Sequence, residues 1–346
     1  MPPVRSTTPG GRFRPVRVDV RLLGLGGVLA LLCLIGFITR PDTFLTQENI
    51  STMLRLAAAI GVVSVGMTFV IIAGGIDLSV GSMVALASVW MTTLATQAYG
   101  PFVMVLCAML VGLGCGLVNG FLISYGKVVP FIMTLAMMAS ARGLAERLSG
   151  RRTQVVTETG FTDFFRGSFL GIPVLVIILA VVFVVGWIVL NRTTFGRRTF
   201  AIGGNSEAAR LSGINVKLHT AIVYGISGLC CGIAAMIVVA RTTTGASTNG
   251  LLYELDAIAA VVIGGTLLAG GRGSLVGTLI GVLIFTVLNS IFTQNNLDTD
   301  IQNIAKGAII VGAVLLQHTT LRRRRGKPSA PAETGNQPTQ PTGSQS

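Results

Sequence analysis

The most constraining feature of the sequence is a succession of apolar segments, each about 20 residues long, separated by short polar links. A helix of roughly 20 apolar residues crosses the roughly 30 Å hydrocarbon core of a bilayer. The segments are too long and too uniformly apolar for the alternating strands of a membrane β-barrel. The sequence therefore predicts an all-α polytopic membrane protein with about ten transmembrane helices. The predicted spans are Leu22–Thr39, Met53–Ala73, Leu78–Gln97, Phe102–Ser124, Val129–Leu148, Ile172–Leu190, His219–Ala240, Leu252–Ala269, Ser274–Thr293 and Ile301–Gln317.

Composition and charge fit a membrane protein. Hydrophobic residues make up 51% of the 346 residues and charged residues only 11%, which is too little polar surface for a soluble protein. The net charge of +13 gathers in the terminal segments and loops rather than on one face, so we expect no nucleic-acid partner. With both termini in the cytoplasm, most basic residues fall on the cytoplasmic side. We expect disordered cytoplasmic tails at 1–20 and 321–346, the second beginning with a basic run, and a transmembrane domain at 21–320.

The sequence carries no catalytic signature. It has no GxxxxGK[ST] loop for nucleotide phosphates, no HExxH and no GxSxG, so we expect no enzyme activity, no cofactor and no metal site. The two histidines, His219 and His318, stand at span edges, where we interpret them as interfacial side chains. The cysteines lie inside apolar runs and are interpreted as packing residues. They are Cys33, Cys107, Cys115, Cys230 and Cys231.

Paired glycines interrupt the apolar pattern at two places. In GMTFVIIAGGIDLSVGS (66–82), Gly74 and Gly75 predict the end of one helix, and Asp77 or Ser79 predicts the start of the next. The stretch 255–281 has a similar pattern, in which an apolar run meets paired glycines at 264 and 265. Each place is either a plain tight turn or part of a moving gate or polar pathway, as broken helices are in transporters.

A few charged residues fall within the predicted spans. Arg142 and Glu146 are four residues apart and are expected to pair on one helix face. Glu254 and Asp256 are expected to favour the amino-terminal dipole of their helix. Lys306 follows two aspartates, at 298 and 300, and is expected to snorkel toward the headgroups.

The predicted cytoplasmic loop 191–218 contains a short helix. In GRRTFAIGGNSEAARLSGINV (196–216), Asn205 is a predicted N-cap, Glu207 lies in the first turn, and Gly213 can end the helix. Such a helix either rests on the membrane surface or acts as a lever that moves the spans on both sides of it.

Four stretches, taken together, resemble the permease subunit of ribose-type sugar importers of the ATP-binding cassette class, from Phe44 to Gln317. They are GMTFVIIAGGIDLSVGS (66–82), NGFLISYGKVVPFIMTLA (119–136), AIGGNSEAARLSGINV (201–216) and YELDAIAAVVIGGTLLAGGRGSLVGTLIG (253–281). The resemblance departs from the family at Ala136, where glycine is frequent, and in the missing Leu-Pro after Gly213.

The resemblance implies a monosaccharide importer in the bacterial plasma membrane. Two permease copies would form the pathway, a cytoplasmic ATPase would supply energy, and an extracytoplasmic binding protein would deliver ribose or a similar sugar. It also implies that the loop helix around Glu207 to Gly213, within the coupling loop 191–218, is the coupling element seated in the ATPase. The expected coupling residues are Asn205, Glu207, Ala208, Ala209, Arg210 and Gly213. The candidate gate or pathway residues are Gly74, Gly75, Asp77, Ser79, Asn119, Gly264 and Gly265.

Two other functions stay open at this point. One is a stand-alone secondary carrier, although no chain of ionisable residues runs through the spans. The other is a permease of the related branched-chain amino-acid type, whose zwitterionic substrate calls for fixed charge or helix ends in the pathway. The match in GGIDLSVGS favours the sugar.

Overall fold

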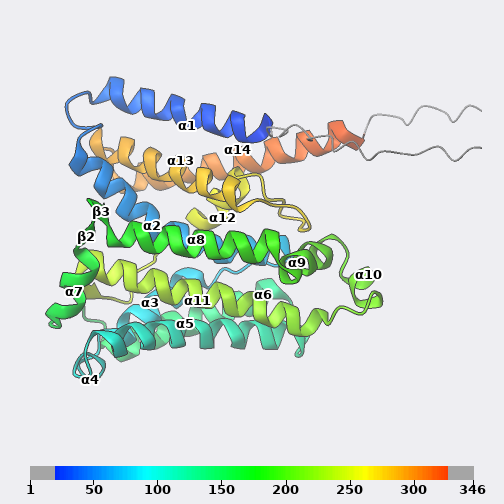
Figure 1. Cartoon of the computed structure of the whole chain (residues 1–346), viewed down its shortest axis with the longest axis horizontal. Coiled ribbons are helices and arrows are strands. Elements are labelled where there is room, and N and C mark those ends of the chain that lie inside the picture. Colours follow the sequence, from blue (N-terminus) through cyan, green and yellow to red (C-terminus); the bar gives the residue numbers. More distant parts are fainter. Residues whose placement is uncertain (1–19, 326–346) are drawn as a thin grey trace, which may run out of the picture.

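The computed structural model describes residues 20–325, and in this range the chain forms long helices lying side by side (Figure 1). The two predicted tails fall almost wholly outside the described residues. The helices are α1 Val20–Thr39, α2 Gln47–Ile72, α3 Val80–Met91, α4 Leu94–Gln97, α5 Pro101–Ser124, α6 Pro130–Ser149, α7 Thr159–Arg166, α8 Val174–Arg192, α9 Thr194–Gly204, α10 Ser206–Leu211, α11 Val216–Thr242, α12 Tyr253–Ile263, α13 Leu275–Gln294 and α14 Thr299–Arg325.

Strands are few and short within the described range. Strand β1 (Gln154–Val155) pairs antiparallel with β4 (Thr244–Gly245), with Gln154 opposite Gly245. Strand β2 (Ser168–Phe169) forms a small hairpin with β3 (Ile172–Pro173). The first pair ties the segment after α6 to the segment after α11. The all-α prediction therefore holds for the body of the molecule.

Six of the described helices are long and apolar enough to cross a membrane. They are α1, α2, α5, α8, α11 and α13. Each of the other four predicted spans coincides with a helix: α6 and α14 are long helices that are not among the six, and α3 and α12 have fewer than 18 residues. This supports a polytopic helical membrane protein.

The two short helices correct the predicted boundaries. The spans expected at 78–97 and 252–269 contain helices of only 12 and 11 residues, α3 and α12. Their amino-terminal ends meet, because a Cβ on Gly250 would lie only 2.7 Å from the carbonyl oxygen of Gly81. The apolar pattern did not separate them from full spans because their flanking links are also apolar and glycine-rich.

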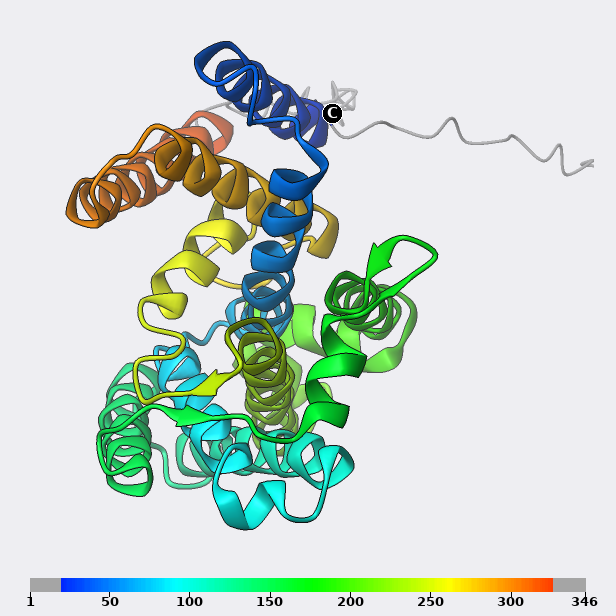
Figure 2. The same ribbon diagram turned by 90° about the vertical axis from the view of Figure 1, so that its left-hand side faces the viewer.

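Helix α11 lies at the centre of the bundle, with α2 and α5 packed against it (Figure 2). Buried residues make up 89% of the most apolar segment of α2 and 78% of that of α11, but only 6% of that of α1. Glycines allow the closest approach: a Cβ on Gly116 of α5 would lie 2.9 Å from the Cα of Gly228 in α11. Small residues at such crossings let helix backbones pack tightly in lipid.

The molecule has two distinct ends. Figure 1 shows the start of α1 and the end of α14 at the same end as α9 and α10. Helices α4 and α7 and the β2–β3 hairpin lie at the opposite end. We name these the α10 end and the α7 end.

Three expectations for single side chains were wrong. Arg142 does not pair with Glu146; it donates to the carbonyl oxygens of Ser247 and Asn249. Lys306 forms an ion pair of 3.4 Å with Asp256, and its side chain is only 18% exposed, so it does not snorkel. His219 is buried and lies 2.8 Å from the hydroxyl of Thr199, so it is a packed side chain rather than an interfacial one.

Candidate functional site

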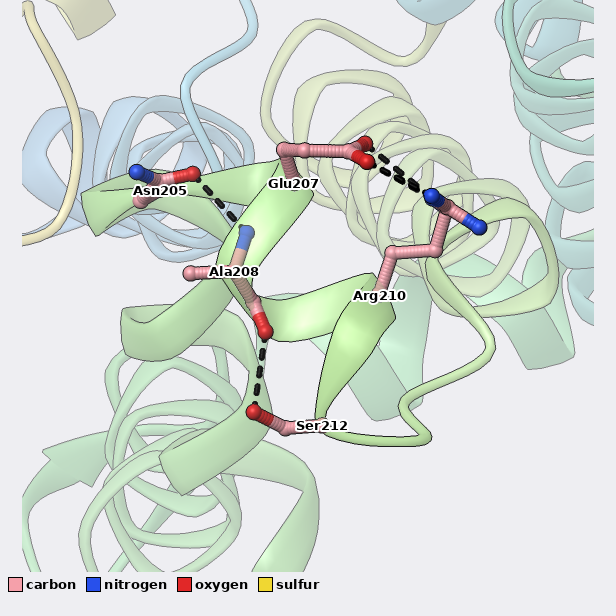
Figure 3. Close-up of polar contacts among 5 residues, drawn as sticks. All are labelled: Asn205, Glu207, Ala208, Arg210 and Ser212. Carbon is pink, nitrogen blue, oxygen red and sulfur yellow. Dashed lines mark hydrogen bonds and ion pairs between the residues drawn. The ribbon is translucent and has the colours of Figure 1, made fainter.

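The predicted lever is two helices rather than one. Helix α9 ends at Gly204, and α10 begins at Ser206, so Asn205 alone joins them. Its backbone N–H donates to the carbonyl oxygen of Ala201 at 3.0 Å, which closes α9. Its side-chain oxygen accepts a 2.9 Å hydrogen bond from the N–H of Ala208, which caps α10 (Figure 3). The N-cap role predicted for Asn205 is confirmed.

The end of α10 is equally well defined. Gly213 has a φ of 82° and donates its N–H to Arg210, while Ile214 donates to Ala209. This pair of bonds is a Schellman motif, which requires a left-handed residue and so favours glycine. Ser212 adds a 2.8 Å hydrogen bond from its hydroxyl to the carbonyl oxygen of Ala208 (Figure 3). A helix of six residues is thus fixed at both of its ends.

The outer face of α10 is charged and solvent-facing. Arg210 donates from Nη2 to Oε1 of Glu207 at 2.6 Å and from Nε to Oε2 at 3.0 Å (Figure 3). The hydrogen bonds from the guanidinium, and then its charge, lower the pKa of the Glu207 carboxyl. Leu211 beside them is 74% exposed, whereas Ala209 is buried against the protein. The helix therefore presents a charged pair and an apolar side chain outward.

The paired glycines act as predicted at helix ends. Gly74 has a φ of 88°, and Gly74 and Gly75 donate their N–H groups to Ile71 and Val70 in a Schellman motif that ends α2. At the end of α12 the same motif occurs one residue later in the pair, because the second glycine, Gly265, with a φ of 89°, is the left-handed residue.

The link between α2 and α3, residues 73–79, carries a buried polar cluster. Asp77 is fully buried, and its Oδ1 accepts hydrogen bonds from the backbone N–H and the hydroxyl of Ser79 at 3.1 and 2.6 Å. Its Oδ2 accepts a 2.9 Å hydrogen bond from the hydroxyl of Ser227 in α11. Ser79 is the N-cap residue of α3, but no side chain caps the helix, so the predicted capping bond to Asp77 or Ser79 is absent. The Asp77 carboxylate instead holds Ser79 in place just before α3 and joins the link to α11.

Two further side chains complete this cluster. Asn119 of α5 donates from Nδ2 to the hydroxyl of Ser79 at 2.9 Å. Within the described residues its Oδ1 is buried without a hydrogen-bond partner. Tyr224 of α11 donates its hydroxyl to the carbonyl oxygen of Ile76 at 3.2 Å. The link, α5 and α11 thus share one network of uncharged donors around a single carboxylate.

The predicted site residues fall into two separate groups. The six predicted coupling residues lie on or beside α10 at one end of the molecule, and Asp77, Ser79 and Asn119 meet inside the bundle. The two glycine pairs lie on links that touch, since the N–H of Gly271 donates to the carbonyl oxygen of Ile72 at 2.9 Å.

Sequence reasoning missed Ser227, Tyr224 and all of α9. Ser227 and Tyr224 are separated from Asp77 by about 150 residues and stand in an apolar helix, so no local signal marks them. The pair Gly203 and Gly204, which precedes α10, could have been used to predict close packing of the backbone at this position.

Comparison with known proteins places the chain in a family. The family model for the branched-chain amino acid transport system permease component matches residues 49–314. The ribose import permease RbsC of Bacillus subtilis is 44% identical over 290 residues, which cover 83% of this chain and 90% of that protein. RbsC of Escherichia coli K12 is 40% identical over 84% of this chain and 92% of its own length. The galactose/methyl galactoside import permease MglC of the same strain is 36% identical over 87% and 96%.

No solved structure matches the chain. The family match covers well over half of the sequence, and the relatives align with it along nearly their whole length. The resemblance drawn from the four sequence stretches is confirmed. The chain belongs to this permease family, whose members similar to it include the ribose and galactose import permeases.

Proposed function

We propose that this chain is the membrane-spanning permease subunit of an ATP-driven importer that carries ribose or a similar monosaccharide into a bacterial cell. The sugar is inferred from the relatives of the chain, which are ribose and galactose import permeases. The observation that carries the proposal is α10, a helix capped at both ends that projects a charged pair from the bundle. A short, rigid, exposed helix between two spans suits a force-bearing contact.

The proposed topology has ten spans, with α3 and α12 as the short ones, and places the α10 end in the cytoplasm. Basic residues support this orientation, because arginines and lysines cluster on and around α9 and α10. They are Arg192, Arg197, Arg198, Arg210 and Lys217. Residues 21–320 then form the permease domain, both termini are cytoplasmic, and 191–218 is the coupling loop.

The permease needs three protein partners. Because the sequence has no nucleotide-phosphate loop, ATP hydrolysis belongs to a cytoplasmic ATPase subunit that seats on α10. A sugar-binding protein docks at the α7 end, and a second permease copy completes the pathway. The exposed apolar faces of helices such as α1 suit the remaining neighbour, membrane lipid.

We propose that the buried cluster around Asp77 forms part of the gate. The polar groups of Ser79, Ser227 and Asn119 can exchange hydrogen bonds with one another or with sugar hydroxyls when the links move. The helix ends at Gly74 and Gly265 leave backbone groups near the same links. A neutral sugar needs no fixed counter-charge, which suits a pathway whose carboxylate is already hydrogen-bonded.

The test is reconstitution of the purified permease in liposomes, with and without the proposed ATPase subunit and sugar-binding protein. We expect ribose uptake only with all three proteins and ATP. Uptake by the permease alone would establish a secondary carrier. Uptake that leucine blocks and ribose does not would establish the amino-acid function. Deletion of 206–213 should abolish stimulation of ATP hydrolysis by loaded binding protein while the permease still inserts.

A further inference from the structure

Three stretches of backbone meet without intervening side chains where α9 ends. The carbonyl oxygen of Ile72, at the end of α2, accepts a 2.9 Å hydrogen bond from the N–H of Gly271 in the α12–α13 link. Gly203 of α9 lies directly over this bond. A Cβ on Gly203 would overlap the Ile72 oxygen and lie 2.6 Å from the Gly271 nitrogen.

Two more glycines close the same contact. A Cβ on Gly270 would lie 2.9 Å from the carbonyl oxygen of Gly203 and 2.9 Å from the Cα of Gly74. Gly74 and Gly270 also have φ values of 88° and 84°, a region that other residues rarely adopt. We call Gly74, Gly203, Gly270 and Gly271 the glycine junction. It joins α9 to the two links, α2–α3 and α12–α13, that follow the helices ending at paired glycines.

Helix α9 is held firmly on its other sides. The ring of Phe195 stacks on His219 of α11 with centroids 4.2 Å apart, and the hydroxyl of Thr199 lies 2.8 Å from His219 Nε2. Phe195 also packs near Phe69 of α2, with ring centroids 6.3 Å apart. These contacts fix the position of α9 against α2 and α11, so the fit at Gly203 is not absorbed by free movement of the helix.

The connection from α9 to α10 is short and stiff. Asn205 is the last hydrogen-bonded residue of α9 and the cap of α10 at once. A displacement of α10 therefore passes to the last turn of α9. Packed backbones resist compression steeply, so that turn passes the displacement on to whatever touches Gly203.

We propose that Gly203 is a positioning residue through which a displacement of α10 moves the α2–α3 link and the α12–α13 link together. The inference deepens the proposed function, since it rests on the ATPase subunit seating on α10. The α2–α3 link carries Asp77 and the cluster that joins it to α5 and α11. Joint movement of the two links would open or close the bundle where α3 and α12 meet.

The chain offers a matched pair of variants. A Cβ on Gly203 has no room, whereas a Cβ on the next residue, Gly204, has no atom within 4 Å. Both residues lie in the last turn of the same helix. Gly203→Ala and Gly204→Ala therefore change helix propensity equally and differ in the contact alone.

The experiment measures ribose uptake and ATP hydrolysis by the complete transporter, reconstituted from permease, ATPase subunit and binding protein. We expect Gly203→Ala to retain the ATPase subunit during purification and to lower ribose transported per ATP roughly tenfold. Gly204→Ala should match the wild type. Wild-type coupling in Gly203→Ala, or equal losses in both variants, would overturn the inference.

A second measurement covers the case in which Gly203→Ala does not fold. Gly204 lies against Gly271, since a Cβ on Gly271 would be 2.8 Å from the Cα of Gly204. Cysteines at Gly204 and at Arg272, the residue after Gly271, joined by a short bifunctional reagent, would link α9 to the α12–α13 link in the complete transporter. If the two move together, crosslinking leaves transport per ATP unchanged. If the crosslink stops transport, α9 and the α12–α13 link must move relative to each other, and the inference is wrong.

The two proposals fail in different ways. If deletion of 206–213 leaves ATP hydrolysis stimulated, α10 is not the seat of the ATPase and the proposed coupling function is wrong. If that deletion abolishes stimulation while Gly203→Ala transports normally, only the role of Gly203 is wrong.

Discussion

Ser227, midway along α11, donates a 2.9 Å hydrogen bond to Asp77, which lies 150 residues earlier in the link between two helices. The same carboxylate accepts two hydrogen bonds from Ser79 and is fully buried. One side chain thus both holds Ser79, the residue before α3, and fastens the link to the centre of the bundle. A tight turn alone would not need the second connection.

Removing this carboxylate should destabilise the bundle. In Asp77→Ala the Ser79 N–H and two hydroxyls lose their acceptor, at a cost of about 1–3 kcal/mol for each group left unsatisfied. Asp77→Asn should lose less, because its oxygen still accepts from Ser79 and its amide can donate to the Ser227 hydroxyl. Thermal unfolding midpoints in detergent should rank wild type, then Asn, then Ala. An alanine variant as stable as wild type would show that the cluster is not structural.

The sequence could predict the features that depend on neighbouring residues. The caps at Gly74, Asn205 and Gly213 are local, because each needs only a backbone conformation or a side-chain oxygen at the right offset. Contacts between helices that are distant in the sequence could not be predicted in this way. Lys306 stands near two aspartates in the chain but pairs with Asp256 in the structure, since the fold rather than sequence spacing sets that distance.

The lengths of the membrane spans were also only partly predictable from the sequence. Apolar length predicted ten spans, yet α3 and α12 are short helices joined to apolar links. Hydropathy cannot distinguish a helix from an apolar link whose backbone groups are satisfied by other segments. The Gly271 to Ile72 hydrogen bond is one such contact.

The crossing of α5 and α11 should tolerate a larger side chain at Gly114 of α5 but not at Gly116. A Cβ on Gly116 would overlap the carbonyl oxygen of Tyr224 and lie 2.9 Å from the Cα of Gly228, whereas a Cβ on Gly114 meets nothing within 4 Å. Gly116→Leu should lower membrane-inserted yield and thermal stability, by roughly 1–3 kcal/mol or more. Gly114→Leu should behave as wild type in the same assays. Similar behaviour of the two variants would argue against the close crossing.

The ion pair between Lys306 and Asp256 should be costly to break from one side. The two side chains are 18% and 8% exposed, so either single variant strands a largely buried charge. We expect Lys306→Met to lose roughly 3 kcal/mol of stability, the scale found for buried pairs. The double variant Lys306→Met with Asp256→Leu should recover most of that loss in thermal unfolding. A double variant no more stable than the single one would contradict the view that Lys306→Met strands a costly buried charge at Asp256.

Glu207 is expected to matter through its charge at the surface of α10 rather than through folding. Its pKa is lowered by Arg210, so the carboxylate favours the folded state above its ordinary pKa and loses this contribution only as pH falls through the lowered value. Between about pH 6 and pH 8 the pair does not titrate. We therefore expect the unfolding midpoint of Glu207→Gln to lie only slightly below that of the wild type, as for the loss of an exposed ion pair, and by the same amount at every pH in this window.

Stimulation of the ATPase subunit should behave differently in the same variant. We expect Glu207→Gln to lower stimulation by loaded binding protein equally at each pH in this window, and Glu207→Asp to restore part of it, because aspartate keeps the negative charge. The measurement is the ratio of stimulated to basal ATP hydrolysis in the reconstituted transporter. Full stimulation of the glutamine variant would remove Glu207 from the contact, since α10 itself stays capped by Asn205 in that variant.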